Sequence, residues 1–337
     1  MLLAALERLG ASRALLFTDP ASGLRAVIVL DDLRLGPAAG GVRTRAYPSL
    51  EAALEDAAGL ARAMTLKCAL SGLRAGGGKA VVLDHPGLDR PRAFERLGAH
   101  IEELGGLFRT AGDLGTRPED LQAMARTCSY VHTEEASLAA SVGRGLRRCA
   151  EAAAWAAGRE GLRGWRAAVQ GVGAIGEAVA RELHRAGCEL LLSDLDEARA
   201  HALAAELGGR VLAPEAVLRA DCDLLSPCAI GGVIGAEQAR AIRAKVLCPG
   251  ANNALRDEES ARILHDRGIL HVPDLLASAG AVVDGIARTV MGEADPAPRI
   301  DAFFEIATSL LERSRLEDRP TPELARILAE ERLRTGI

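Results

Sequence analysis

Two of the three lysines in this chain lie close together, beside a run of glycines. Lysine and arginine number 41 in total, yet only Lys67, Lys79 and Lys245 are lysines. Lys79 directly follows three glycines in the stretch SGLRAGGGKAVVLD, residues 71–84. A buried lysine can release its proton, whereas an arginine stays protonated in proteins. The two neighbouring lysines therefore indicate a site that needs an amine able to lose a proton, with chance placement as the alternative.

A phosphate-binding loop is a second interpretation of the glycine run. Such a loop has a glycine five residues before its Gly-Lys pair and a serine or threonine after the lysine. Leu73 and Ala80 occupy these two positions, so no hydroxyl is available for a magnesium ion. A third interpretation is an ordinary turn with a solvated lysine. The scarcity of lysine elsewhere favours a chemical role for Lys79 at the mouth of the buried strand KAVVL.

A second glycine-rich motif indicates a nucleotide. Gly171, Gly173 and Gly176 have the GxGxxG spacing, and they follow an apolar strand and open an amphipathic helix, which is the context that the motif requires. The first glycine permits a tight turn, the second admits a pyrophosphate and the third lets helix pack on strand. The helix N-terminus favours the phosphate charge. The alternative is an α/β domain that binds no nucleotide.

The next strand, ELLLSD, ends in Asp194. A carboxylate there accepts hydrogen bonds from the ribose hydroxyls and repels a 2′-phosphate, so NAD is favoured over NADP. Arg199 follows shortly after and keeps NADP as a minority interpretation.

Composition narrows the class of protein. The chain has 337 residues, of which 49% are hydrophobic and 26% charged, and its net charge of −5 gives no basic footprint for nucleic acid. No apolar run reaches transmembrane length and no signal peptide is evident, so we expect a cytoplasmic protein without a membrane partner. The seven cysteines lack paired spacing and are expected to be free thiols. The histidines form no metal-binding pattern, and we expect no metal.

Strand and helix patterns predict an α/β fold with two domains separated by a cleft. From Arg166 onward, short apolar strands alternate with helices, which is typical of a parallel, doubly wound Rossmann-type sheet that binds NAD. The N-terminal part mixes strands and helices and is expected to be an α/β substrate domain. We assign 1–135, together with the C-terminal helices at about 302–337, to substrate binding and oligomerisation. Residues 136–301 are assigned to the dinucleotide-binding domain.

Ordered motifs in both parts resemble a known family. LGPAAGG, MTLKCALSGLRAGGGKAVV, TAGDLGT, VQGVGAIG, SPCAIGG and PGANNAL occur in this order between about Leu15 and Arg334. They are similar to the glutamate/leucine/phenylalanine/valine dehydrogenases, and most closely to the leucine, phenylalanine and valine branch. The resemblance implies oxidative deamination of an L-amino acid with NAD to a 2-oxo acid and ammonia.

The resemblance also implies residue roles. Lys79 would be the base that activates water, Asp113 would exchange protons with the amino group and Lys67 would bind the α-carboxylate. Other implied substrate contacts are Gly40, Gly41, Met64, Ala39, Val282, Gly285 and Asn253. The implied cofactor contacts are Gly171, Val172, Gly173, Ala174, Ile175, Gly176, Asp194, Cys228, Ala229, Ile230, Ala251 and Asn252.

Physical chemistry agrees with the role of Lys79. Water must attack an iminium after hydride transfer, and a base with a pKa near neutrality serves this step best. Burial and a neighbouring ammonium both lower the pKa of a lysine, and Lys67 would be that neighbour. The glycines before Lys79 are expected to let the substrate approach closely.

The chain departs from the family at several places. The segment HTEEASLAASVGRG is shorter than the usual linker and lacks its threonine, for which Ser137 or Ser141 would substitute. Ser278 stands where relatives have asparagine. The C-terminal tail is short, so we expect a homodimer rather than a larger assembly.

The substrate side chain is expected to be hydrophobic. Ala39 and Gly285 stand where leucine-type relatives have larger residues, so an aromatic amino acid such as phenylalanine should be at least as good a substrate as leucine. Ala39 also stands where a glutamate enzyme has lysine, so glutamate is expected to be inactive. The alternatives are a glutamate-type dehydrogenase and an inactive NAD-binding sensor of the same fold.

Overall fold

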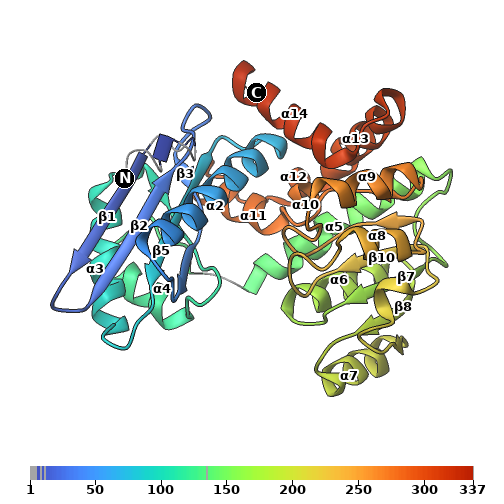
Figure 1. Ribbon diagram of the computed structural model, residues 1–337, viewed down its shortest axis with the longest axis horizontal. Helices are drawn as coiled ribbons and strands as arrows, with labels where there is room; N and C mark the ends of the chain where they lie inside the picture. The colour runs from blue at the N-terminus through green and yellow to red at the C-terminus, as the bar shows by residue number, and fades with distance from the viewer. Residues whose placement is uncertain (1–5, 8–9, 11–12, 134–135, 337) are drawn as a thin grey trace. The chain divides into compact units, whose positions relative to one another are not determined.

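The structure, a computed structural model, describes residues 6–7, 10, 13–133 and 136–336. The chain divides into two compact units (Figure 1). Unit 1 comprises Met1–Glu135, Gly285–Ala294 and Ala329–Ile337, and unit 2 comprises Ala136–Asp284 and Asp295–Leu328.

Unit 1 is built on a mixed sheet. Its strands are β1 (Arg13–Asp19), β2 (Leu24–Leu30), β3 (Ala38–Ala39), β4 (Val42–Arg45), β5 (Gly76–Leu83) and β6 (Phe108–Arg109). They are ordered β1-β2-β5-β3-β6, and β4 also pairs with β5. β1, β2 and β5 are antiparallel neighbours, whereas β3 and β4 run parallel to β5. The sequence places Lys79 at the mouth of a strand, but the structure places it inside β5, because the glycines before it already pair with neighbouring strands.

Helices cover both faces of this sheet. They are α2 (Leu50–Leu70), α3 (Arg90–Glu103) and α4 (Pro118–Ala125). Ser49 caps α2 as predicted, with its Oγ accepting a hydrogen bond from the Ala52 N–H at 3.1 Å. Val29 and Val81 lie in one apolar cluster with residues of α2, whereas Ile28 and Val82 lie in another with residues of α3. Alternate residues of β2 and β5 therefore face opposite layers, as the two-residue period of a strand requires.

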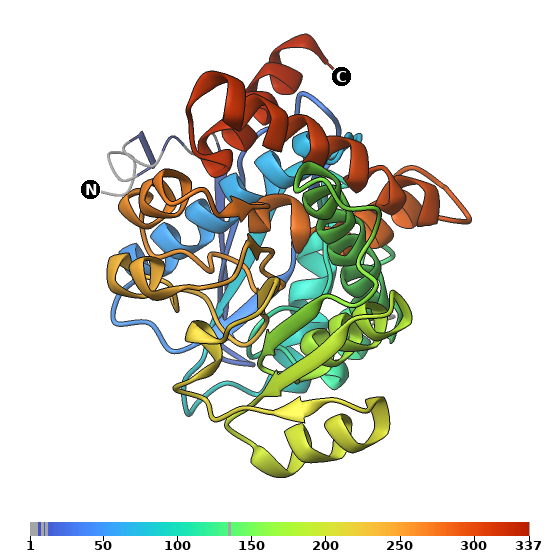
Figure 2. The same cartoon turned by 90° about the vertical axis from the view of Figure 1, so that its right-hand side faces the viewer.

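Unit 2 contains a second, entirely parallel sheet. Its strands are β7 (Arg166–Gln170), β8 (Glu189–Ser193), β9 (Arg210–Val211), β10 (Leu224–Pro227), β11 (Val246–Leu247) and β12 (Leu270–His271). The order β12-β11-β10-β7-β8-β9 is that of a dinucleotide-binding doubly wound fold. Figure 2 shows β9 and helix α7 (Glu197–Leu207) at one edge of the unit. The predicted fold class is confirmed.

The remaining helices belong mainly to unit 2. They are α5 (Ala136–Ala156), α6 (Ala174–Arg185), α8 (Ala236–Ala241), α9 (Glu258–Asp266), α10 (Asp274–Ala277), α11 (Gly280–Thr289), α12 (Ala297–Asp301), α13 (Phe303–Glu317) and α14 (Thr321–Thr335). No helix in the described ranges has the length and apolar character needed to cross a bilayer.

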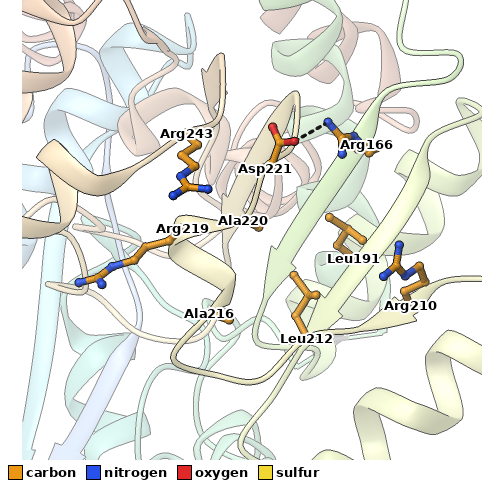
Figure 3. Close-up of a pocket in the computed structure, with 9 residues that line it drawn as sticks. All are labelled: Arg166, Leu191, Arg210, Leu212, Ala216, Arg219, Ala220, Asp221 and Arg243. Atoms are coloured by element: carbon orange, nitrogen blue, oxygen red, sulfur yellow. Dashed lines mark hydrogen bonds and ion pairs between the residues drawn. The ribbon is translucent and has the colours of Figure 1, made fainter.

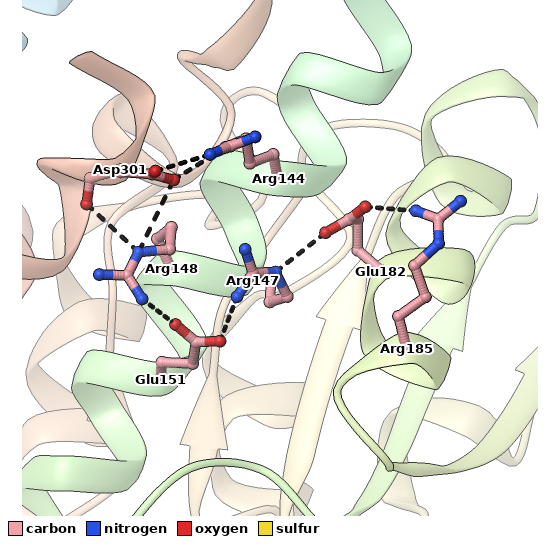
Figure 4. A network of polar contacts seen from close by, with 7 residues as sticks. All are labelled: Arg144, Arg147, Arg148, Glu151, Glu182, Arg185 and Asp301. Carbon is pink, nitrogen blue, oxygen red and sulfur yellow. Dashed lines mark hydrogen bonds and ion pairs between the residues drawn. The ribbon is translucent and has the colours of Figure 1, made fainter. Parts of the chain in front are cut away.

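Arginines along α5 connect it to its neighbours (Figure 4). Arg144 donates to both carboxylate oxygens of Asp301 at the end of α12, at 2.8 and 2.6 Å. Arg147 donates to Glu182 of α6 at 2.9 Å and also pairs with Glu151 of its own helix. These partly buried pairs fix the position of α5 against α6 and α12.

The C-terminal helices are divided between the two units differently from the prediction. The sequence assigns about 302–337 to the first domain, but residues 295–328 belong to unit 2 because α13 packs on α5. Only the end of α14 belongs to unit 1, where Arg332 donates to the carbonyl oxygens of Ala69 and Leu70 at the end of α2.

Candidate active site

Three strands of unit 1 place polar residues on one face of the sheet. Ala39 is the register partner of both Gly77 and Arg109. The Gly40 and Val42 N–H groups donate to the carbonyl oxygens of Arg109 and Ala111, so the ladder continues beyond β6. Since side chains alternate along a strand, every second residue counted from Ala39, Gly77 and Arg109 lies on the same face of the sheet. That face carries Gly41 and Arg43, then Lys79, and finally Ala111 and Asp113.

Lys79 and Asp113 meet on this face. Lys79 is 6% exposed, and its Nζ lies 2.6 Å from Asp113 Oδ2. Burial lowers the pKa of Lys79, and the Asp113 carboxylate opposes that shift without cancelling it. The amine is thus easier to deprotonate than an ordinary lysine. The structure brings together the two residues that the sequence assigns to catalysis.

Arg43 is a third member of this cluster. Its Nε donates to the same Asp113 Oδ2 at 2.9 Å. Burial alone would raise the pKa of Asp113, but the charges of Lys79 and Arg43 outweigh it and hold that pKa below its ordinary value. Asp113 is therefore a stable carboxylate that presents one oxygen to two cations.

Arg43 is held in turn by Asp56 of α2. Arg43 Nη1 lies 3.2 Å from both carboxylate oxygens of Asp56, which also accepts a hydrogen bond from the Tyr47 hydroxyl at 2.5 Å. Burial, followed by this bond to Asp56, raises the pKa of Tyr47. Arg43 was not predicted from the sequence, although it stands two residues after Gly41 and the strand period places both on one face.

Lys67 lies in the last turn of α2 and is 7% exposed. Two residues earlier, Thr65 donates to Asp31 Oδ2 at 2.6 Å, which ties the helix to the end of β2. Met64 is half-buried in the same turn. The role of Lys67 at a substrate carboxylate remains a prediction.

The glycine run before Lys79 has a packing reason that the sequence analysis did not give. A Cβ at Gly77 would overlap the main chain of α2 at Ala61 and Thr65, and one at Gly78 would lie 2.9 Å from the Phe108 ring. These glycines let α2 and β6 approach β5, so close approach of a substrate is not needed to explain them.

The paired glycines of LGPAAGG have a similar reason. A Cβ at Gly40 would overlap the Gly78 carbonyl oxygen, and one at Gly41 would lie 3.0 Å from the Asp113 Cβ. Gly41 therefore permits Asp113 to take its place beside Lys79. Contact of either glycine with a substrate carboxylate remains a prediction.

The second glycine-rich motif forms the expected turn in unit 2. Gly171 has a φ of 83°, and a Cβ there would lie 2.5 Å from the Ala229 Cβ. A Cβ at Gly176 would overlap the Gly171 carbonyl oxygen. In contrast, a Cβ at Gly173 would meet only Arg199 Nη1, at 4.0 Å, so the start of α6 is open to a ligand. Ala174 and Ile175 form the first turn of that helix, whose N-terminus suits a phosphate.

Asp194 lies at the end of β8 beside this turn. Its Oδ2 accepts a hydrogen bond from the Val172 N–H at 2.7 Å, and its Oδ1 accepts one from Asp196 at 2.9 Å. Arg199 Nη1 lies 3.8 Å from Oδ2. Both of the residues that the sequence analysis weighed for cofactor choice are therefore at the glycine-rich turn.

The loops after β10 and β11 contain the other predicted cofactor contacts. Judged by its exposed surface, Cys228 is half-buried, and desolvation raises the pKa of its thiol to about 12. Ala229 packs on Gly171, and Ile230 is 68% exposed. After β11, Ala251 is largely buried and the Asn252 side chain accepts a hydrogen bond from Ser278 Oγ at 2.8 Å.

Asn253 has a left-handed backbone with a φ of 52°, and its N–H donates to Asp274 Oδ2 at 2.7 Å. Ser141, in α5, donates to Asp284 at 2.7 Å, whereas the side chain of Ser137 lies outside the described part of the chain. Val282 is half-buried in α11.

A pocket of unit 2 lies away from the glycine-rich turn (Figure 3). It is at the opposite end of the sheet, where β7 and β9 begin, and its polar lining consists of Arg166, Arg210, Arg219, Arg243 and Asp221. Figure 3 shows the side chains of Arg210 and Arg219 at opposite ends of this pocket, so they do not converge on one point. Among the residues that the structure describes, no cluster of three or more His, Cys, Asp or Glu residues could hold a metal ion.

Family models match both units. Residues 12–130 match the dimerisation domain of the Glu/Leu/Phe/Val dehydrogenases, and residues 191–285 match the Glutamate/Leucine/Phenylalanine/Valine dehydrogenase model. The chain belongs to this family. Its amino-acid dehydrogenases are oxidoreductases, and membership implies a nicotinamide cofactor, which the open glycine-rich turn of unit 2 fits.

Similar proteins place the chain in the leucine/phenylalanine/valine branch. A leucine dehydrogenase of Bacillus cereus is 33% identical over 97% of this chain and 92% of its own length. A phenylalanine dehydrogenase of Thermoactinomyces intermedius is 31% identical over 98% and 93%. The crystal structure of L-tryptophan dehydrogenase from Nostoc punctiforme has a TM-score of 0.86 and 28% identity, with 99% of each chain covered. The chain is thus an amino-acid dehydrogenase.

Proposed function

We propose that this protein catalyses the reversible, NAD-dependent oxidative deamination of an L-amino acid. An amino acid, NAD and water give a 2-oxo acid, ammonium, NADH and a proton. The observation that carries the proposal is the 2.6 Å contact between the buried Lys79 and the half-buried Asp113, on a sheet face that also holds Arg43. A family scaffold that had lost its activity would not need to keep a lysine buried in this way.

The proposed roles follow from charge and burial. NAD held at the glycine-rich turn of unit 2 would supply the acceptor for the hydride that leaves the substrate Cα, which leaves an imine. Lys79 in its neutral form takes a proton from the water that attacks the resulting imine, a step helped by its lowered pKa. Asp113, kept ionised by Arg43, accepts and returns a proton at the substrate nitrogen. Lys67 binds the α-carboxylate as a cation, for which its position in the last turn of α2 is suited.

NAD is proposed as the cofactor rather than NADP. Asp194 is a carboxylate beside the open turn at Gly173, where it would accept hydrogen bonds from the ribose and repel a 2′-phosphate. Arg199 is 3.8 Å away and partly offsets this charge.

The size of the substrate side chain is proposed from two small residues of unit 1. Ala39 is buried beside Arg109, and a Cβ at Gly285 would meet no atom within 4 Å. Leucine, phenylalanine and tryptophan dehydrogenases are among the similar proteins. We therefore propose a hydrophobic substrate side chain, with aromatic ones used at least as well as leucine and glutamate inactive.

A homodimer is proposed for the assembly. The family model that matches residues 12–130 describes a dimerisation domain, which supports self-association through unit 1. Light scattering of the purified chain measures the mass of the particle, and a monomer or a hexamer would contradict the proposal.

The function is tested by NADH formation. The protein is mixed with NAD and a panel of L-amino acids at alkaline pH, and absorbance of NADH is followed. We expect turnover with part of the panel and release of ammonia in equal amount. No turnover with any amino acid, by a protein that still binds NADH, would instead favour a sensor.

A further inference from the structure

The end of the chain is fixed to the end of helix α2. Arg332, in the last turn of α14, donates to the carbonyl oxygen of Ala69 at 3.3 Å and also to that of Leu70. The last carbonyl groups of a helix have no partner within the helix, and a cation placed there also suits the helix dipole. Arg332 therefore caps α2, although it lies 262 residues after Leu70 in the sequence.

This cap is stronger than its neighbouring contact. The side chain of Arg332 is half-buried, and in the described part of the chain no carboxylate pairs with it. Its guanidinium makes charge-assisted hydrogen bonds to the helix end instead. Nearby, Glu330 of α14 pairs with Arg62 of α2 at 2.9 Å, with both side chains largely exposed. An exposed pair of this kind contributes little, so the cap carries more of the attachment of α14 to α2.

The capped turn of α2 contains Lys67. Lys67 is two residues before Ala69, and its side chain is only 7% exposed. The same turn is also held from the side of the sheet, because the buried Thr65 donates to Asp31 Oδ2 at 2.6 Å. Helix ends fray when their carbonyl groups lack partners. With contacts before and after it, Lys67 is held in one position.

We propose that Arg332 is a positioning residue for the substrate carboxylate, because its cap on α2 holds Lys67 where the ammonium group binds that carboxylate. This inference rests on the proposed function, which assigns the α-carboxylate to Lys67. Arg332 acts through Lys67 and is not assigned a contact with the substrate. The C-terminal end of the chain thus belongs to the substrate site of unit 1.

The cap should affect substrate binding rather than the chemical step. A displaced Lys67 weakens the carboxylate contact equally before and during hydride transfer, and such a loss raises KM with little change in kcat. The proposed cofactor turn belongs to unit 2, whereas Arg332 and Lys67 belong to unit 1. NADH binding should therefore be unaffected.

The first experiment compares three single variants. KM and kcat are measured for L-phenylalanine and L-leucine, and the dissociation constant of NADH is measured by fluorescence. In Arg332→Leu we expect KM to rise roughly tenfold, with kcat and NADH binding nearly unchanged. Arg332→Lys keeps a cation at the helix end and should recover part of the loss. Glu330→Gln is the matched control, since it breaks the exposed pair between the same two helices, and its KM should stay at the wild-type value.

A double variant tests whether Arg332 acts through Lys67. Lys67→Ala alone should raise KM at least as much as Arg332→Leu does. Adding Arg332→Leu to Lys67→Ala should then change KM little, because the contact that the cap serves is already gone. Effects that simply multiply in the double variant would overturn the inference.

Other outcomes also overturn it. A lower melting temperature of Arg332→Leu with an unchanged KM would leave Arg332 a role in stability alone, and weaker NADH binding in that variant would show a disturbance of the whole fold. An unchanged KM in Lys67→Ala would remove the carboxylate role of Lys67 and this inference with it. Failure of the proposed function is a different result, namely no turnover of any amino acid by the wild-type protein.

Discussion

Lys79 Nζ and Asp113 Oδ2 are 2.6 Å apart, and the Arg43 guanidinium donates to the same carboxylate oxygen. Two cations on one oxygen keep Asp113 ionised, while burial lowers the pKa of Lys79. The cluster thus holds a carboxylate and a readily deprotonated amine side by side.

Lys79→Arg should lower kcat by roughly a hundred-fold or more. A guanidinium stays protonated and so cannot accept a proton from water as a general base. The positive charge beside Asp113 is kept, so folding and NADH binding should persist. Lys245→Arg is the matched control, since Lys245 pairs with Asp223 on the surface of unit 2. Substantial deamination by Lys79→Arg would refute the assignment of the base.

Arg43→Gln should move the pH profile of kcat to higher pH. The neutral form of Lys79 is the active one, so the rate rises as pH rises through the pKa of Lys79. Arg43 helps to lower that pKa, and its removal lets the pKa rise. The profile of Arg43→Lys, which retains the charge but not the forked contact with Asp113 and Asp56, should stay nearer to the wild type. An unchanged or acid-shifted profile in Arg43→Gln would contradict this coupling.

Asp194→Asn should increase the use of NADP relative to NAD by about tenfold or more. The substitution removes the charge that repels a 2′-phosphate but keeps an oxygen that can accept from the Val172 N–H. Comparing kcat/KM for the two cofactors measures this, with Asp196→Asn as an exposed neighbouring control. A wild-type enzyme that uses NADP as well as NAD would show that Arg199 outweighs Asp194.

Gly77→Ala should destabilise the protein by about 1–3 kcal/mol or more, because the new methyl group would overlap main-chain atoms of α2 that cannot move alone. Gly285→Ala is the matched change in open space, and inside helix α11 it should raise the free energy of unfolding by about 0.5–1 kcal/mol or leave it unchanged. Denaturant unfolding of both variants tests the pair. Equal stability of the two would mean that α2 can shift away from β5 at little cost.

Phenylalanine should be used at least as well as leucine, since Ala39 and Gly285 leave volume for a ring. The substitutions Ala39→Leu and Gly285→Val should lower kcat/KM for phenylalanine more than for leucine. The ratio of the two values should change by roughly tenfold, because pocket volume discriminates only modestly between substrates. The measurement is kcat/KM for both substrates on each protein. A strong wild-type preference for leucine or valine would refute the volume argument.

The sequence by itself determined the fold class, the family and the glycine-rich turn of unit 2, because these depend on local patterns. Alternating apolar strands and helices, the GxGxxG spacing and ordered motifs are readable along the chain. Lys79 was also identifiable, since a chain with so few lysines places two beside one glycine run.

Tertiary structure decided which side chains meet. Arg43 and Asp113 are 70 residues apart in the sequence. Only the register of β4, β5 and the segment after β6 brings the Arg43 guanidinium to the Asp113 carboxylate. The packing reason for Gly77 depends on a helix crossing it, and the place of α13 depends on its contact with α5. Such properties arise from contacts between distant segments, which local sequence patterns do not specify.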